Sequence, residues 1–149
     1  MGEPSIEFLT PERVLEMRDW LTPKLQEACD ANEIARENLT PDDIIRAAIR
    51  GDGVMFLYSE DKVPACVLVI QLYTEGAKKV ADVVALAGEK LTSFKRHYWQ
   101  LILTWLRENN VEYLDAYVDK RRAKIYQSRF GFNKSCALVR MNLQGVCHE

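Results

Sequence analysis

The sequence is poor in the residues that build metal sites, and it has no segment suited to a membrane span or a secretory signal. Its four cysteines include no Cys-x-x-Cys pair, and only two histidines could join them, so we expect no zinc or other metal site. No apolar run approaches the roughly 18 residues that a membrane span needs. The N-terminus lacks a basic stretch followed by an apolar one. We therefore expect a soluble cytoplasmic protein in a reducing compartment, with free thiols.

An excess of charge of one sign is lacking as well. The formal net charge is −2 over 149 residues, so there is no overall basic field to hold nucleic acid. Hydrophobic residues make up 48% of the chain and charged residues 28%, a balance typical of a folded domain. A chain of this length buries roughly 68–70% of its unfolded surface, enough for one core. We predict a single domain over residues 1–143 and a C-terminal tail over 144–149.

The tripeptide Leu-Thr-Pro occurs three times, at residues 9–11, 21–23 and 39–41. Threonine is a favoured N-cap, and proline is favoured in the first helical turn. The pattern predicts helix starts, and the unequal spacings and unlike flanks argue against a sequence repeat. We expect a helix over 11–21 that kinks or restarts at Pro23 and runs to about residue 31. A second helix is expected over 42–50, ending at Gly51.

Six segments have the apolar patterns of strands: 5–9, 54–59, 63–73, 79–87, 111–118 and 135–143. Short polar turns at 60–62 and 75–78 join three of them, which predicts an antiparallel meander. The run over 65–70 is almost continuously apolar, as in a sheet interior covered on both faces.

The segment after residue 91 has the clearest helical periodicity, and Thr92 or Ser93 is its expected N-cap. One buried stripe is predicted from the apolar spacing i, i+4, i+7, i+8, i+11, i+12, namely Phe94, Tyr98, Leu101, Ile102, Trp105 and Leu106. Trp99 falls off this stripe, and we expect it to be exposed, where it could meet another protein. The predicted element order is β-α-α-β-β-β-α-β-α-β.

Residues 120–143 predict a helix that stops at Gly131 and turns directly into a strand. Tyr126 lies five residues before that glycine, and Phe132 follows it. This segment resembles the C-terminal motif of the GNAT N-acetyltransferases, and the element order resembles the GNAT fold over nearly the whole chain. The resemblance implies an α+β fold whose central sheet is mixed, mostly antiparallel and flanked by helices.

The resemblance also implies that Tyr126 is the catalytic acid that protonates a departing thiolate. The ordinary tyrosine pKa of about 10 keeps the hydroxyl protonated at neutral pH, as this role requires. The alternative is a helix-face aromatic residue packed against the sheet.

An acetyl-CoA site at the end of the fourth strand is the next implication of the resemblance. In the GNAT family this strand bulges away from the fifth and exposes backbone groups to pantetheine, while the following loop offers N–H groups to the pyrophosphate. The positions implied here are Val84, Ala85, Leu86, Ala87, Gly88, Lys90, Leu91, Thr92 and Ser93, with Lys124 from a basic cluster.

This loop departs from the family pattern in three ways. The second glycine is missing, the leading Gln or Arg is absent, and Glu89 adds a negative charge where the pyrophosphate would approach. A plain turn is therefore the alternative to a cofactor loop. The basic cluster that contains Lys124 has a solvated helix face as its alternative, and it lacks the aromatics that stack bases, which disfavours nucleic acid.

The sequence indicates less clearly which residue would accept the proton that the amine loses. The carboxylate candidates on the fourth and fifth strands are Asp82, Glu112 and Asp115. Asp82 stands inside an apolar run, and an outward-facing or edge position is the simpler interpretation. His97 is expected on the flank of its helix.

Two functions follow from the resemblance. The first is an N-acetyltransferase in which an amine attacks acetyl-CoA directly. The second is a GNAT-fold protein without catalysis, acting as an assembly or interaction subunit and similar to small acetyltransferase-like proteins encoded by tailed phages. A homo-oligomer or a protein partner fits this second function. An unrelated α+β domain that matches by chance is a third alternative.

Overall fold

The computed structural model describes residues 2–31, 40–116 and 130. Lys124, Tyr126, the predicted last strand and all of the predicted last helix except Phe130 lie outside these residues. The described elements are β1 (Pro4–Phe8), α1 (Pro11–Glu16), α2 (Arg18–Ala31), α3 (Pro41–Arg50), β2 (Gly53–Glu60), β3 (Val63–Glu75), β4 (Lys78–Gly88), α4 (Leu91–Phe94), η1 (Lys95–Trp99), α5 (Gln100–Glu108) and β5 (Val111–Ala116). Up to β5, this order matches the predicted one, except that the first predicted helix is divided into α1 and α2.

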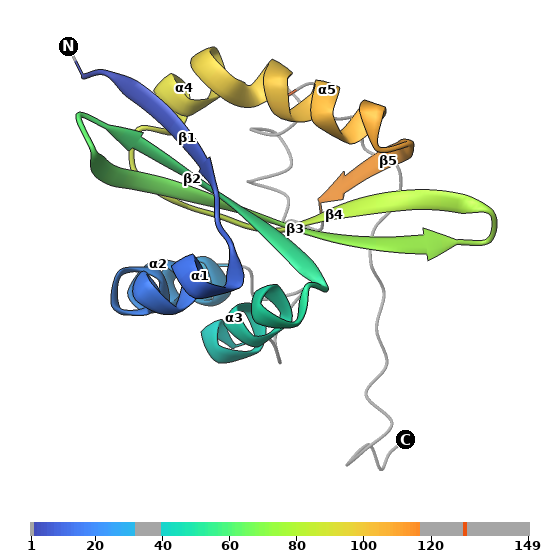
Figure 1. Ribbon diagram of the computed structural model, residues 1–149, viewed down its shortest axis with the longest axis horizontal. Helices are drawn as coiled ribbons and strands as arrows, with labels where there is room; N and C mark the ends of the chain where they lie inside the picture. The colour runs from blue at the N-terminus through green and yellow to red at the C-terminus, as the bar shows by residue number, and fades with distance from the viewer. Residues whose placement is uncertain (1, 32–39, 117–129, 131–149) are drawn as a thin grey trace, which may run out of the picture.

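The five described strands form one sheet in the order β1-β2-β3-β4-β5. The first three pairings are antiparallel, and β4 pairs with β5 in parallel. Helices α1, α2 and α3 cover one face of this sheet, and the helix formed by α4, η1 and α5 covers the other (Figure 1). The predicted mixed, mostly antiparallel sheet flanked by helices is therefore confirmed.

Two of the three Leu-Thr-Pro segments start helices, as predicted. The Thr10 hydroxyl accepts from the Arg13 N–H, and Thr40 forms a full capping box with Asp43. The segment at residues 21–23 does not start a helix, because Pro23 lies inside α2 and the break falls earlier, at Met17. The kink that was the alternative at Pro23 stays a prediction.

A local hydrogen bond accompanies this internal proline. A proline removes one intrahelical donor, and in the preceding residue the Thr22 hydroxyl donates to the Arg18 carbonyl at 2.9 Å.

The long helix departs from simple periodicity through the π-helical turn η1. A π-helical turn inserts an extra residue and rotates the following side chains. Trp99 consequently points inward and is only 3% exposed, whereas Leu101 is 57% exposed. The predicted exposure of Trp99 and burial of Leu101 are both wrong for this reason. Phe94, Ile102 and Leu106 are buried as predicted.

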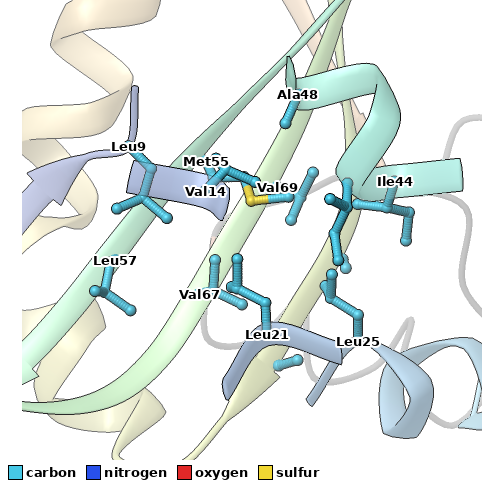
Figure 2. Close-up of a cluster of buried hydrophobic side chains, with 13 residues drawn as sticks. Leu9, Val14, Leu21, Leu25, Ile44, Ala48, Met55, Leu57, Val67 and Val69 are labelled. Atoms are coloured by element: carbon cyan, nitrogen blue, oxygen red, sulfur yellow. The ribbon is translucent and has the colours of Figure 1, made fainter. Parts of the chain in front are cut away.

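The sheet separates two apolar cores. Between the sheet and α1–α3 lie residues such as Val14, Leu21, Ile44, Met55 and Val67 (Figure 2). The other core packs Phe94, Trp99, Ile102 and Leu106 against the opposite face, with Tyr58, Leu68 and Ile70. Coverage on both faces accounts for the continuous apolar run in β3. No helix in the described ranges has the length and apolarity needed to cross a bilayer.

Candidate functional site

Strand β4 carries a bulge at Val84. Val69 of β3 pairs with Ala85, but the next β3 residue, Ile70, pairs with Val83, so Val84 is the extra residue. A bulge bends its strand and frees backbone groups from the ladder. The β4–β5 ladder is described up to the pair Val83 and Ala116, the last described residue of β5. A bulge in β4, as the family resemblance implied, is therefore present, while the separation of β4 from β5 stays a prediction.

Gly88 ends β4 in a conformation that suits only glycine. Its φ is +121°, and a Cβ there would lie 2.3 Å from the Ala65 carbonyl oxygen and 2.8 Å from the Cys66 Cα. The next residue, Glu89, donates its N–H to that same Ala65 carbonyl at 2.8 Å. The single glycine of this loop thus allows the chain to pass directly over β3 before the helix begins.

The start of the helix differs from the prediction. Lys90 is the N-cap, with φ of +61° and no side-chain hydrogen bond to the cap, and α4 begins at Leu91. Thr92 and Ser93 therefore lie within the first turn, and the prediction that either caps the helix is wrong. The left-handed conformation at Lys90 supplies the sharp change of direction between strand and helix.

Glu60, at the end of β2, reaches across to this loop. Its carboxylate accepts from the Lys90 Nζ at 2.9 Å and from the Tyr58 hydroxyl at 2.6 Å. The hydrogen bond from Tyr58 is the main cause of the lowered pKa of Glu60, followed by the hydrogen bond and the charge of Lys90. The Glu60 side chain is only 13% exposed, whereas that of Lys90 is 53% exposed. We call Tyr58, Glu60 and Lys90 the Glu60 cluster.

The Glu60 cluster predicts a pH dependence of stability. Because the folded pKa of Glu60 lies below the ordinary value of 4.5, its contribution is present above that value and is lost as the pH falls through the lowered one. We expect the unfolding free energies of wild type and Glu60→Gln to differ at neutral pH and to converge in acid. Urea unfolding across this pH range measures the difference. A difference that does not change with pH would contradict the assignment.

The structure brings most of the predicted cofactor residues together at one end of β4. Ala85 and Ala87 are buried against α1–α3, while Leu86 and Leu91 are partly buried on the opposite face. Thr92 is exposed. Lys124 and Tyr126 lie outside the described residues, so their predicted roles stay predictions.

Phe130 is the one described residue of the C-terminal motif. The indole Nε1 of Trp99 donates to its carbonyl at 3.3 Å, and the two rings are 5.0 Å apart in an edge-to-face arrangement. The residue that follows Tyr126 by four positions is thus held against η1. The inward rotation of Trp99 by the π-helical turn makes this contact.

Asp82 is buried, at 4% exposure, so the interpretation as an outward or edge residue is wrong. In the ladder it pairs with Gln71 of β3 on one side and Asp115 of β5 on the other. Opposed residues share a face of a sheet, so these three form a polar row across it. Burial is the main cause of a raised pKa at Asp115, with a smaller effect of Glu75. His97 is exposed on its helix, as predicted.

A pocket of about 200 Å³ lies between α3 and the same face of the sheet. Gln71 connects it to the polar row, and Val84 connects it to the bulge. The rest of its wall is made by Asp43, Ile44, Ala47, Arg50, Gly53, Val69 and Ile70. Its charged groups already have partners, because Arg50 pairs with Asp52 at 3.0 Å and Asp43 closes the capping box of α3.

Sequence reasoning missed the Glu60 cluster and the polar row. Along the sequence, residues 60–62 indicate only a polar turn, and nothing in their spacing connects them to Lys90, thirty residues later. Asp82 did carry a signal, a carboxylate within an apolar strand, which becomes informative only when the sheet register is known.

No protein-family model and no curated protein sequence matches the chain. Solved structures do match. A predicted acetyltransferase from Clostridium acetobutylicum, crystallised with acetyl-CoA, aligns with a TM-score of 0.69 at 11% identity, covering 98% of this chain and 100% of the other. An aminoglycoside acetyltransferase from an uncultured soil metagenomic sample, in complex with sisomicin, aligns with a TM-score of 0.64 at 14% identity over 95% and 97%.

A ribosomal-protein-alanine N-acetyltransferase from Brucella melitensis biovar Abortus 2308 aligns with a TM-score of 0.60 at 14% identity, covering 94% of this chain and 100% of the other. At such low identities the likeness establishes the fold. The chain has the fold of the GNAT acetyltransferases, as the sequence predicted. The likeness to phage-encoded proteins stays a prediction.

Proposed function

We propose that the chain is an N-acetyltransferase that transfers an acetyl group from acetyl-CoA to an amine by direct attack. The observation that carries this proposal is the Val84 bulge, which lies at the end of the strand that leads into the Gly88 loop, within a fold shared with acetyltransferases. The freed backbone of β4 would pair with pantetheine, and the loop N–H groups would meet the pyrophosphate at the helix start. Gly88 fits this role because a side chain there would displace the loop.

The reaction requires one proton acceptor and one proton donor. The amine nitrogen forms a bond to the thioester carbonyl carbon, the C–S bond breaks, and the thiolate leaves with the bonding pair. In the proposal Tyr126 gives its proton to that thiolate. Asp82 is our candidate to take the proton that the amine loses, because it is a buried carboxylate in register with Gln71, which lines the pocket.

The acceptor amine would enter through the pocket between α3 and the sheet. Its size suits a small amine or one arm of a larger one, since pockets for drug-sized ligands are about 300–1,000 Å³. Aminoglycosides and the α-amine of a peptide, by analogy with the acetyltransferases of the same fold, are the first acceptors to screen.

Thermal unfolding with acetyl-CoA tests the proposal. Binding at 100 times the dissociation constant should stabilise the fold by about 2.7 kcal/mol, which raises Tm by roughly 5–10 °C in a domain of this size. ATP serves as the polyanion control and should give no comparable rise. Once an acceptor is found, Tyr126→Phe should lower kcat by about 10²–10⁴. Full activity in that variant would remove Tyr126 from the mechanism.

A second candidate function is a non-catalytic assembly or interaction subunit. The specific observation in its favour is the ion pair between Lys90 and Glu60, which neutralises the cation of a loop that already lacks the second glycine. Absence of acetyl-CoA binding, together with a stable homo-oligomer or partner complex by light scattering, would favour this function over the first.

A further inference from the structure

The loop after β4 has three side chains suited to phosphate, namely Lys90, Thr92 and Ser93. Glu60 already engages the first of them. Its carboxylate lies 2.9 Å from the Lys90 Nζ. The carboxylate therefore occupies the cation of the loop.

The position of Glu60 is fixed by a second hydrogen bond. The Tyr58 hydroxyl donates to its second oxygen at 2.6 Å, and the Tyr58 side chain is fully buried, with its ring 5.8 Å from that of Phe94. A charge-assisted hydrogen bond from a rigid donor is stronger than one between neutral groups. Glu60 is thus anchored to the core, while the long Lys90 side chain is more than half exposed.

An anchored carboxylate at this place opposes an anionic ligand in two ways. It occupies the one cation in the described part of the loop, and its own charge repels phosphate at short range. Asp61 and Glu89 add negative charge around Lys90. Phosphate groups gain the full charge of Lys90 only if its contact with Glu60 weakens, because the carboxylate otherwise neutralises that charge.

We propose that Glu60 is an internal competitor for the phosphate groups of acyl-CoA and sets the affinity of the chain for that substrate. This inference rests on the proposed function, because it assumes that the Gly88–Ser93 loop is the phosphate-binding loop. Lys90 is the shared partner: it pairs with Glu60 in the free protein and with phosphate in the complex.

Isothermal titration of CoA into wild type and Glu60→Gln tests the inference. The amide keeps the size of the side chain and an oxygen that accepts from Tyr58, but it removes the charge. We expect CoA to bind about tenfold more tightly to Glu60→Gln than to wild type. Pantetheine, which has no phosphate, should bind both proteins equally. The gain with CoA should shrink as salt is raised.

Asp61→Asn is the matched control. Asp61 is a carboxylate of the same hairpin, and it accepts from the backbone N–H of Glu3 at 2.8 Å, whereas the carboxylate that pairs with Lys90 is that of Glu60. This variant removes the same charge without releasing Lys90, so CoA affinity should rise much less than in Glu60→Gln. If Glu60→Gln and Asp61→Asn raised the affinity for CoA equally, the change in net charge alone would explain the gain, and the inference would be overturned.

Lys90→Gln provides a second, independent test of the competition for Lys90. With Glu60 present, the loss of the Lys90–Glu60 pair offsets part of what a Lys90–phosphate contact contributes, so Lys90→Gln should weaken CoA binding less than it does in the Glu60→Gln background. In the Glu60→Gln background the same change should remove most of the tenfold gain. Thermal unfolding of each variant confirms that it is folded. A Lys90 effect of equal size in both backgrounds would contradict competition.

The outcomes separate this inference from the proposed function. CoA binding by wild type with no gain in Glu60→Gln overturns the role of Glu60 and leaves the function standing. Binding by Glu60→Gln alone, or a phosphate-dependent gain in it, supports the inference. No binding of CoA to any variant overturns both.

Discussion

Gly88→Ala should lower the stability of the protein by about 3 kcal/mol, the combined effect of positive-φ strain and overpacking. The added Cβ would lie 2.3 Å from the Ala65 carbonyl oxygen and 2.8 Å from the Cys66 Cα. Both are backbone atoms of a central strand, so neither can move aside as a flexible side chain would. For a domain of this size, the loss corresponds to a fall in Tm of roughly 6–12 °C.

Alanine substitutions at two other glycines separate the effect of the steric clash from the effect of positive-φ strain. Gly76 also has a positive φ, of +64°, but a Cβ added there would meet no atom within 4 Å, and one added at Gly53 would make only an ordinary contact of 3.5 Å with the Ile70 carbonyl. Gly76→Ala should therefore cost about 1 kcal/mol from strain alone. Gly53→Ala should be near neutral. Thermal unfolding of the three variants gives the order.

A Gly88→Ala effect no larger than that of Gly76→Ala would contradict the close approach of the loop to β3. If the large effect is found, CoA binding by the variant should be measured below its lowered Tm. Displacement of this loop should weaken binding to any ligand that uses the loop N–H groups, and it should do so even where the protein is still folded.

The fold could be predicted because several local signals agree. The three central strands are joined by short polar turns, which specify an antiparallel meander, and Thr10 and Thr40 cap their helices as the sequence predicted. Apolar continuity in β3 indicated a sheet covered on both faces. Each of these signals acts between residues that are close in sequence.

The wrong predictions concern features that local sequence signals do not determine. Burial of Trp99 depends on the π-helical turn η1, which follows from tertiary packing and not from a sequence period. The Leu-Thr-Pro pattern predicts a helix start at Pro23, but α2 runs through this residue and the break falls at Met17. These features depend on contacts or backbone geometry that a pattern along the chain does not contain.

The candidate site was predictable only in part for the same reason. The end of β4 and Gly88 could be identified, because strand, turn and helix follow one another directly. Glu60 meets Lys90 only after β3 and β4 have paired and brought the β2–β3 hairpin beside the loop. The burial of Asp82 likewise depends on a sheet register that joins it to Gln71 and Asp115.

Asp82→Asn should have the largest effect on the proposed reaction. If Asp82 accepts the proton of the amine, the amide cannot do so, and kcat should fall by about 10²–10⁴, the usual contribution of a general base. The size of the side chain is conserved, so Tm should change much less than in Gly88→Ala. CoA affinity should change little, because Asp82 is not among the residues proposed to bind CoA.

Glu112→Gln is the matched control, because Glu112 is an exposed carboxylate on β5 and its replacement should leave kcat unaltered. The pH profile distinguishes catalysis from simple positioning. In wild type the rate should rise with pH as the proton acceptor ionises, and in Asp82→Asn this limb should disappear while the low remaining rate follows the ionisation of the amine itself. Equal losses in the two variants, or a retained limb in Asp82→Asn, would exclude Asp82 as the acceptor. The proton would then have to leave through water or through the neighbouring Asp115, whose raised pKa suits it to the role.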